Sequence, residues 1–169
     1  KMFKEYNRFW TDTKRDKAAK LNLTPNEVMT LASIVYEESK EKDEQPIVAG
    51  LYLNRLKIGM PLQADPTLKF AAYQLPKYKN TIIRRVLNEH KEIESPYNTY
   101  KNSGLPPGLI VMPDLSAVNA VLDYENHKYL YMVADAKRIG YHKFAKTLAQ
   151  HNAYAREYHR YLSSQGINR

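Results

Sequence analysis

The segment Leu23-Thr-Pro-Asn-Glu-Val-Met-Thr-Leu-Ala-Ser-Ile-Val-Tyr-Glu-Glu-Ser39 predicts the central helix of the fold. Thr24 is a suitable N-cap, Pro25 fits the first helical position, and Glu27 can complete a capping box with Thr24. We therefore expect a helix that begins near Pro25 and ends in the charged run from Lys40 to Glu44.

Glu38 is the most informative residue of this helix, because it is an acid on a face that should be apolar. Leu31, Ile34, Val35 and Glu38 share one helical face by their spacing. A carboxyl group at the edge of an apolar surface has its charged form disfavoured, so its pKa rises, as a general acid requires. The alternative is that Glu38 only pairs with a Lys or Arg at the helix end.

Glu37, its neighbour, lies on another face, which the sequence predicts to be polar. That face also carries Asn26, Thr30 and Ser33. Glu37 is therefore expected to have no part in the chemistry.

The composition limits the class of protein. The 169 residues fit one domain with a proper core, and no apolar run is long enough to span a bilayer. The chain has no cysteine, which excludes disulfides, thiol catalysis and thiolate metal sites. A net charge of +8 and 14 tyrosines favour a polar polymer as partner, either glycan or nucleic acid.

Periodicity and turn residues predict a helix-dominated α+β domain with one β-hairpin. Helices are expected at about 2–21, from Pro46 to before Gly59, at 68–73, at 81–90, from Ser116 to about 123, and at 148–162. Strands are expected at 129–134 and 142–146 around Gly140. Between them lie two proline-stiffened segments, a loop at Met60–Thr67 and an irregular stretch at Ser95–Pro113, which is the kind of loop that carries function.

Several chemistries find no support in the motifs. The five histidines show no metal-ligand spacing, and neither a phosphate-binding loop nor a nucleophile elbow is present. We therefore expect no metal and no cofactor. Acid-catalysed cleavage of a sugar polymer does fit, and a conventional glycosidase would need a second carboxylate. Asp65, in a loop between two prolines, could supply it.

Motifs in one fixed order closely resemble the catalytic domain of the YceG-like endolytic murein transglycosylases, the MltG family. They are Leu31-Ala-Ser-Ile-Val-Tyr-Glu-Glu38, Asn54-Arg-Leu56, Met60-Pro-Leu-Gln-Ala-Asp-Pro-Thr67, Tyr97-Asn-Thr-Tyr100, Gly104-Leu-Pro-Pro-Gly108, Gly140-Tyr-His-Lys-Phe-Ala-Lys-Thr147 and His151-Asn152. The resemblance covers about residues 21–162, so we expect residues 1–20 to be a helical lead-in and 21–169 the catalytic domain.

The resemblance implies a bacterial enzyme of cell-wall assembly. It would be held in the cytoplasmic membrane by an N-terminal helix, followed by a LysM-like segment, both upstream of Lys1, with the catalytic domain on the periplasmic side. The implied partners are peptidoglycan glycan strands and cell-wall synthases, with no nucleic acid. Two positions depart from the family pattern: Tyr36 stands where the first of two acids is usual, and Lys143 where a small or β-branched residue often follows the histidine.

The implied reaction is non-hydrolytic. Glu38 protonates the glycosidic oxygen between MurNAc and GlcNAc, and the MurNAc C6 hydroxyl then attacks C1, which leaves a 1,6-anhydro-MurNAc end. Because the nucleophile belongs to the substrate, no second catalytic carboxylate is needed. The predicted substrate-binding residues are Asn54, Gln63, Asp65, Tyr97, Asn98, Thr99 and Tyr100.

Each of these assignments has an alternative. Asn98 and Thr99 could instead cap backbone groups, Asp65 could form an Asx-turn, and His142 and His151 are expected to be structural hydrogen-bonding groups. The segments 60–67 and 97–100 are expected to form opposite parts of one open substrate groove around Glu38. The rival functions are a hydrolytic muramidase using Glu38 and Asp65, and a non-catalytic glycan- or nucleic-acid-binding module.

Overall fold

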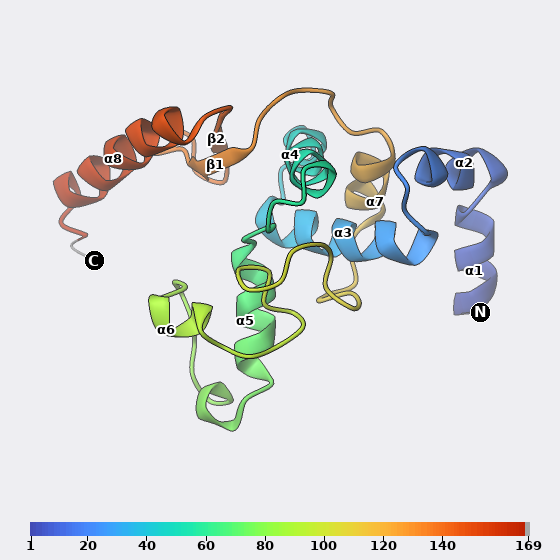
Figure 1. Ribbon diagram of the computed structural model, residues 1–169, viewed down its shortest axis with the longest axis horizontal. Helices are drawn as coiled ribbons and strands as arrows, with labels where there is room; N and C mark the ends of the chain where they lie inside the picture. The colour runs from blue at the N-terminus through green and yellow to red at the C-terminus, as the bar shows by residue number, and fades with distance from the viewer. Residues whose placement is uncertain (168–169) are drawn as a thin grey trace.

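The computed structural model describes residues 1–167 and confirms a single helix-dominated α+β domain (Figure 1). In chain order the elements are α1 (Met2–Phe9), α2 (Asp12–Lys20), α3 (Pro25–Glu38), α4 (Gln45–Lys57), α5 (Asp65–Tyr73), a 3-10 turn η1 (Pro76–Tyr78), α6 (Asn88–Lys91), α7 (Leu115–Leu122), β1 (Tyr131–Ala134), β2 (His142–Ala145) and α8 (Leu148–Ser164).

Helix α3 begins with the predicted capping box. The Thr24 hydroxyl accepts a hydrogen bond from the Glu27 backbone N–H, and the Glu27 carboxylate accepts one from the Thr24 backbone N–H. These two bonds satisfy donors that a helix start leaves unpaired. The helix ends at Glu38 with Ser39 as C-cap, before the charged run in which its end was expected.

The polar face of α3 is buried at Thr30 and Ser33, while Asn26 and Glu37 are exposed. Thr30 is 4 % exposed and Ser33 is completely buried. The Ser33 hydroxyl donates to the Thr30 carbonyl and accepts from the backbone N–H of Ile110, so the irregular segment after Gly104 covers this face. The hydroxyl groups are hydrogen-bonded within the protein, which removes most of the cost of burying them.

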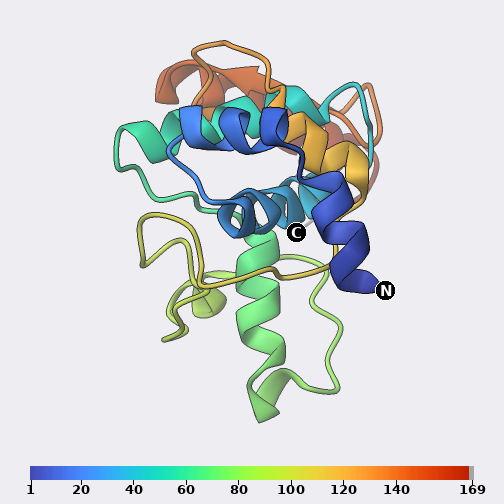
Figure 2. The same cartoon turned by 90° about the vertical axis from the view of Figure 1, so that its right-hand side faces the viewer.

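The main core lies between α3, α4 and α7, which pack against one another (Figures 1 and 2). Leu31, Ile34 and Val35 are fully buried in it, as their spacing predicted. Residues 2–21 form two helices that meet at Trp10, where one exposed helix was expected. Trp10 and Ala18 belong to the main core, so this lead-in packs onto the rest of the domain.

A second, smaller core surrounds helix α5, which runs away from the layer of α3 and α4 (Figure 2). It contains Ala71, Ala72, Tyr78, Ile83 and Ile93. The helix expected at 81–90 forms only at Asn88–Lys91. In the segment before it Ile82 is 77 % exposed while Ile83 is buried, the alternation of an extended chain.

Helix α5 also begins earlier than expected, at Asp65, so the predicted loop at 60–67 ends at Ala64. Pro66 lies in the first turn of the helix, where a missing N–H costs nothing. The predicted opening of the next helix by Ser116 is also displaced, because α7 begins at Leu115 with Asp114 as N-cap.

The β-hairpin is antiparallel, with Tyr131 opposite Ala145 and Ala134 opposite His142. The segment 123–130 crosses α4 to reach it (Figure 1). Gly50 permits this close crossing, since a Cβ there would lie 2.4 Å from the Glu125 carbonyl oxygen. Helix α8 packs on both strands and extends away from the main core. Within residues 1–167, no helix is long and apolar enough to span a membrane.

Candidate active site

A cavity of about 310 Å³ lies at the C-terminal end of α3. Its lining comes from elements far apart in the sequence. It comprises Glu38, Leu51, Tyr52, Arg55, Leu62, Gln63, Asp65, Tyr100, Met132, Val133, Ala134 and His142. The cavity thus brings the predicted acid together with three of the predicted substrate-binding residues, and with the hairpin.

Glu38 is held by one direct hydrogen bond. The hydroxyl of Tyr52, a fully packed residue of α4, donates to Glu38 Oε1 at 3.1 Å. Burial raises the pKa of Glu38 from 4.5 to about 7, and the negative charge of Asp65 adds to the rise. His142, the Tyr52 hydrogen bond and Lys69 act in the opposite direction. Near neutral pH this carboxyl group can therefore hold a proton and release it.

Asp65 lies at the start of α5 and accepts a hydrogen bond from the Tyr100 hydroxyl. Burial of Tyr100, this hydrogen bond and the charge of Asp65 all raise the pKa of the tyrosine, which therefore stays a neutral donor. The Asp65 side chain itself is exposed in the cavity. This pair places one carboxylate and one aromatic ring beside Glu38.

The segments 60–67 and 97–100 lie side by side at the cavity, and not on opposite sides as expected. The Gln63 backbone N–H donates to the Thr99 carbonyl at 3.1 Å, and the Ala64 N–H donates to Thr99 Oγ1 at 3.0 Å. The hydroxyl groups of Thr67 and Thr99 are 2.8 Å apart. The two segments thus form one wall, and the hairpin supplies another.

Gln63 has a backbone conformation that is unusual for a residue with a side chain. Its φ is 49°, in the left-handed region that non-glycine residues rarely adopt. The side chain is exposed and lines the cavity. The hydrogen bond of its N–H to Thr99 holds it in this conformation, which aims a polar side chain at the site.

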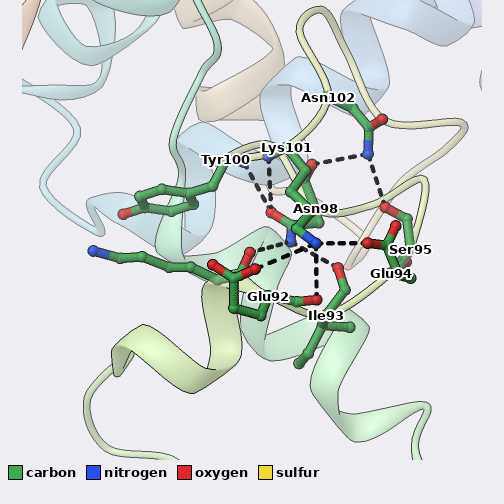
Figure 3. Close-up of polar contacts among 9 residues, drawn as sticks. Glu92, Ile93, Glu94, Ser95, Asn98, Tyr100, Lys101 and Asn102 are labelled. Atoms are coloured by element: carbon green, nitrogen blue, oxygen red, sulfur yellow. Dashed lines mark hydrogen bonds and ion pairs between the residues drawn. The ribbon is translucent and has the colours of Figure 1, made fainter.

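Asn98 is completely buried, and its side chain is fully used inside the protein (Figure 3). The amide nitrogen donates to the carbonyls of Lys91 and Ile93, at 2.9 and 2.8 Å, and the amide oxygen accepts from the Tyr100 N–H at 2.9 Å. Asn98 therefore holds the wall segment in shape, which was the alternative interpretation of this residue and of Thr99.

Two further predicted contact residues are not among those that line the cavity. The Tyr97 ring packs on Phe70 of α5, with centroids 4.6 Å apart. The Asn54 amide donates to the carbonyls of His127 and Tyr129, at 2.9 and 3.0 Å, and fixes the crossing segment onto α4. Both side chains position elements around the site.

Arg55 is a lining residue that sequence reasoning missed. Its Nε donates to the Leu130 carbonyl at 2.7 Å, and its Nη1 donates to the carbonyls of Pro61 and Leu62. Arg55 therefore ties the wall loop to the base of the hairpin. Its sequence neighbours gave no signal, because one partner, Leu130, lies 75 residues away and the other two are backbone carbonyls of a loop.

His142 also lines the cavity, and it rests on a buried acid. Its Nδ1 is 2.9 Å from Glu44 Oε2, and its backbone N–H donates to the other oxygen of the same carboxylate. Glu44 is only 3 % exposed. His151, by contrast, stacks on Tyr131 at 5.4 Å between centroids and is absent from the cavity lining.

A second hollow within residues 1–167 lacks the features of this cavity. A larger hollow of about 750 Å³ lies at the N-terminal end of α3, lined mainly by leucines, prolines and short polar residues. Its only acid, Glu27, is bound in the capping box. Among residues 1–167, no group of three or more His, Asp or Glu side chains could hold a metal ion.

Comparison with known proteins identifies the family of the chain. The model of the YceG-like family matches residues 1–157. A protein of Bacillus subtilis strain 168 named endolytic murein transglycosylase is 40 % identical over 164 residues, which are 97 % of this chain and 42 % of that protein. A protein of the same name from Streptococcus pneumoniae serotype 2 strain D39 is 37 % identical over 114 residues, 68 % of this chain and 20 % of its own length.

A crystal structure of a YceG-like protein from Listeria monocytogenes matches with a TM-score of 0.70 at 36 % identity. The match covers 82 % of this chain and 43 % of the Listeria chain. The chain thus spans less than half the length of each of these relatives. The family match over nearly the whole chain confirms the resemblance in the motifs: the chain belongs to the YceG-like family.

Proposed function

We propose that this chain is a lytic transglycosylase domain that cleaves the β-1,4 bond between MurNAc and GlcNAc within peptidoglycan strands, without hydrolysis. The observation that carries the proposal is Glu38, a carboxyl group with a pKa of about 7 in a polar cavity. The name of the relatives from Bacillus and Streptococcus supports peptidoglycan as the substrate.

In the proposed reaction Glu38 acts first as acid and then as base. The neutral carboxyl group gives its proton to the glycosidic oxygen, and the C1–O bond breaks to leave an oxocarbenium-like centre on MurNAc. The C6 hydroxyl of the same sugar then bonds to C1, and the Glu38 carboxylate takes the hydroxyl proton. Glu38 returns to its starting state, and the product carries a 1,6-anhydro ring.

Tyr52 supports both halves of this cycle. Its hydroxyl remains a neutral donor, because burial and the charge of Glu38 raise its pKa well above the ordinary value. The hydrogen bond to Glu38 Oε1 fixes the carboxyl group in one orientation and stabilises it when it is ionised. Orientation of this kind lowers the barrier, since the acid needs no rearrangement at the moment of reaction.

Gln63, Asp65 and Tyr100 are the side chains that we propose as direct substrate contacts, because they line the cavity. Asn98, Thr99, Asn54 and Tyr97 are then residues that build and hold its walls. The open groove needed for a polymer is proposed to run between the wall at 60–67 and 97–100 and the hairpin.

A hydrolytic muramidase is the second candidate, because Asp65 lies in the same cavity as Glu38. The hydrogen bond that Asp65 accepts from Tyr100 favours a positioning role for this carboxylate. Placement at the outer face of the bacterial cytoplasmic membrane, cell-wall synthases as partners and a role in cell-wall assembly remain predictions from the resemblance.

The proposal is tested by comparing Glu38→Gln with Glu37→Gln on purified peptidoglycan. Glu37 is the adjacent residue, exposed and paired with Lys40, so its substitution is a matched control. We expect Glu38→Gln to lower turnover by at least about a hundredfold, a typical loss for a general acid, and Glu37→Gln to retain it. Equal turnover by both variants would reject Glu38 as the acid.

A further inference from the structure

Glu44 and His142 form a pair in which only the histidine lines the cavity. Glu44 is 3 % exposed, and both of its carboxylate oxygens accept hydrogen bonds from His142, one from the backbone N–H at 2.6 Å and one from Nδ1 at 2.9 Å. The histidine ring is thereby fixed on the cavity wall formed by β2. Glu44 itself is not among the residues that line the cavity.

The β-hairpin does not need this side-chain pair in order to form. Strand pairing needs only the backbone of His142, which pairs with Ala134. A buried carboxylate is costly unless it is paired and hydrogen-bonded, and here its partner is the side chain of a residue that lines the same cavity as Glu38. The arrangement fixes the His142 side chain in the cavity that holds the proposed acid.

We propose that His142, held in place by buried Glu44, is a positioning residue of the cleavage reaction, and that its positive charge stabilises the carboxylate that Glu38 becomes after it releases its proton. The inference rests on the proposed function of Glu38. The Glu44–His142 pair acts through Glu38, and it transfers no proton itself.

The charge states agree with this role. Burial lowers the pKa of His142, but the hydrogen bond and the charge of Glu44 outweigh it, so the pKa lies above the ordinary value of 6.5. Burial raises the pKa of Glu44, but the hydrogen bonds from His142 and Ser39 outweigh it, so Glu44 stays ionised. Both directions favour the charged form of the pair, an imidazolium held by a carboxylate.

His142 is one of several groups that act on Glu38, from each element around it. The others are Tyr52 and Arg55 of α4 and Asp65 and Lys69 of α5. Tyr100 of the wall segment lines the same cavity and donates to Asp65. After burial itself, the charge of His142 has the largest effect on the pKa of Glu38. Asp65 acts in the opposite direction. Removing His142 should therefore raise the pKa of Glu38, because burial and Asp65 would then be less opposed. The proton on Glu38 would become harder to release.

The test is a direct titration of Glu38 in the full chain by carbon-13 NMR, with glutamate labelled at the carboxyl carbon. The Glu38 signal is identified by its absence in Glu38→Gln. The variants are His142→Gln and Glu44→Gln, and the matched control is Lys143→Gln. Lys143 is the next residue of the same strand, carries the same charge, and pairs with Glu157 of α8.

We expect His142→Gln to raise the titration midpoint of Glu38 by roughly one pH unit, the usual effect of losing a nearby opposite charge. Glu44→Gln should move the midpoint in the same direction, because His142 without its carboxylate loses its proton at lower pH. Lys143→Gln should leave the midpoint in place. A midpoint unchanged in His142→Gln would overturn the inference, and this variant decides the matter even if Glu44→Gln fails to fold.

A kinetic measurement separates this inference from the proposed function. If Glu38 is the acid, the alkaline limb of the kcat/KM profile moves to higher pH in His142→Gln, by as much as the NMR midpoint does. A midpoint that moves in a protein with no cleavage activity would support the electrostatic pair and reject the transglycosylase proposal. A limb that stays in place while the midpoint moves would reject the role of the pair in the reaction.

Discussion

Replacing Glu38 with Gln should stabilise the fold at alkaline pH, and this effect can be measured without any substrate. Burial, with a smaller contribution from Asp65, raises the pKa of Glu38 from 4.5 to about 7. Between these two values the folded protein holds a proton that the unfolded chain has lost. The stability that depends on protonated Glu38 is therefore fully present below pH 4.5 and is lost as the pH rises through about 7.

The size of the effect follows from the two pKa values. Each pKa unit corresponds to about 1.4 kcal/mol, so ionised Glu38 should cost the folded state about 3 kcal/mol above pH 8. Gln has nearly the shape of protonated Glu, and its amide oxygen can still accept the hydrogen bond of Tyr52. The variant should therefore match the wild type near pH 4 and exceed its stability by about 3 kcal/mol at pH 9.

Urea denaturation at a series of pH values measures this difference. With an m-value of about 2 kcal/mol/M, the variant's midpoint at pH 9 should lie about 1 to 2 M above that of the wild type. Glu37→Gln is the control, since Glu37 is exposed. The difference in urea midpoint between this variant and the wild type should not grow with pH. A difference between Glu38→Gln and wild type that is the same at pH 4 and pH 9 would refute the buried, proton-holding state of Glu38.

Three further substitutions test the surroundings of Glu38. Tyr52→Phe removes the hydrogen bond that favours the Glu38 carboxylate. The alkaline limb of the kcat/KM profile should therefore move to higher pH by about one unit or less. A limb that moves to lower pH would contradict this. Asp65→Asn removes a charge that raises the pKa of Glu38, so the limb should move down, and anhydro product should still form at a reduced rate. Asn98→Ala leaves buried carbonyls at Lys91 and Ile93 without a donor, so thermal unfolding should show a fall in Tm of about 5 to 10 °C. An unchanged Tm would remove Asn98 as a support of the wall.

The features that local sequence could predict are the ones whose causes lie within a few residues. The capping box of Thr24 and Glu27 and the apolar stripe ending at Glu38 both depend on neighbours one to four residues apart. The hairpin at 131–145 was predicted for the same reason, from β-forming residues on both sides of a turn containing Gly140. Because the residues involved are close in sequence, these features could be predicted without knowledge of the rest of the fold.

The features that the sequence did not predict have causes that lie far away in the chain. Ser33 is buried because the backbone of Ile110, 77 residues later, covers it. Ile82 and Ile83 lie in an extended segment where the local pattern favoured a helix, because Ile83 packs into the second core. Both are cases in which tertiary packing overrides local preference.

The candidate site divides in the same way. Glu38 could be predicted, because its own helix places it at the end of an apolar stripe. The roles of the wall residues could not, because Asn98 and Thr99 have side chains that suit substrate contact and backbone capping equally well. Only the three-dimensional contacts show both of them hydrogen-bonded within the protein.

The central claim is that one carboxyl group is enough, because the substrate's own C6 hydroxyl replaces water. The most direct measurement is mass analysis of peptidoglycan fragments released by the wild-type chain in water enriched in oxygen-18. We predict ends that are lighter by one water than reducing ends and that carry no oxygen-18. Reducing ends labelled with oxygen-18 would contradict the account and identify a hydrolase in which Asp65 is the second carboxylate.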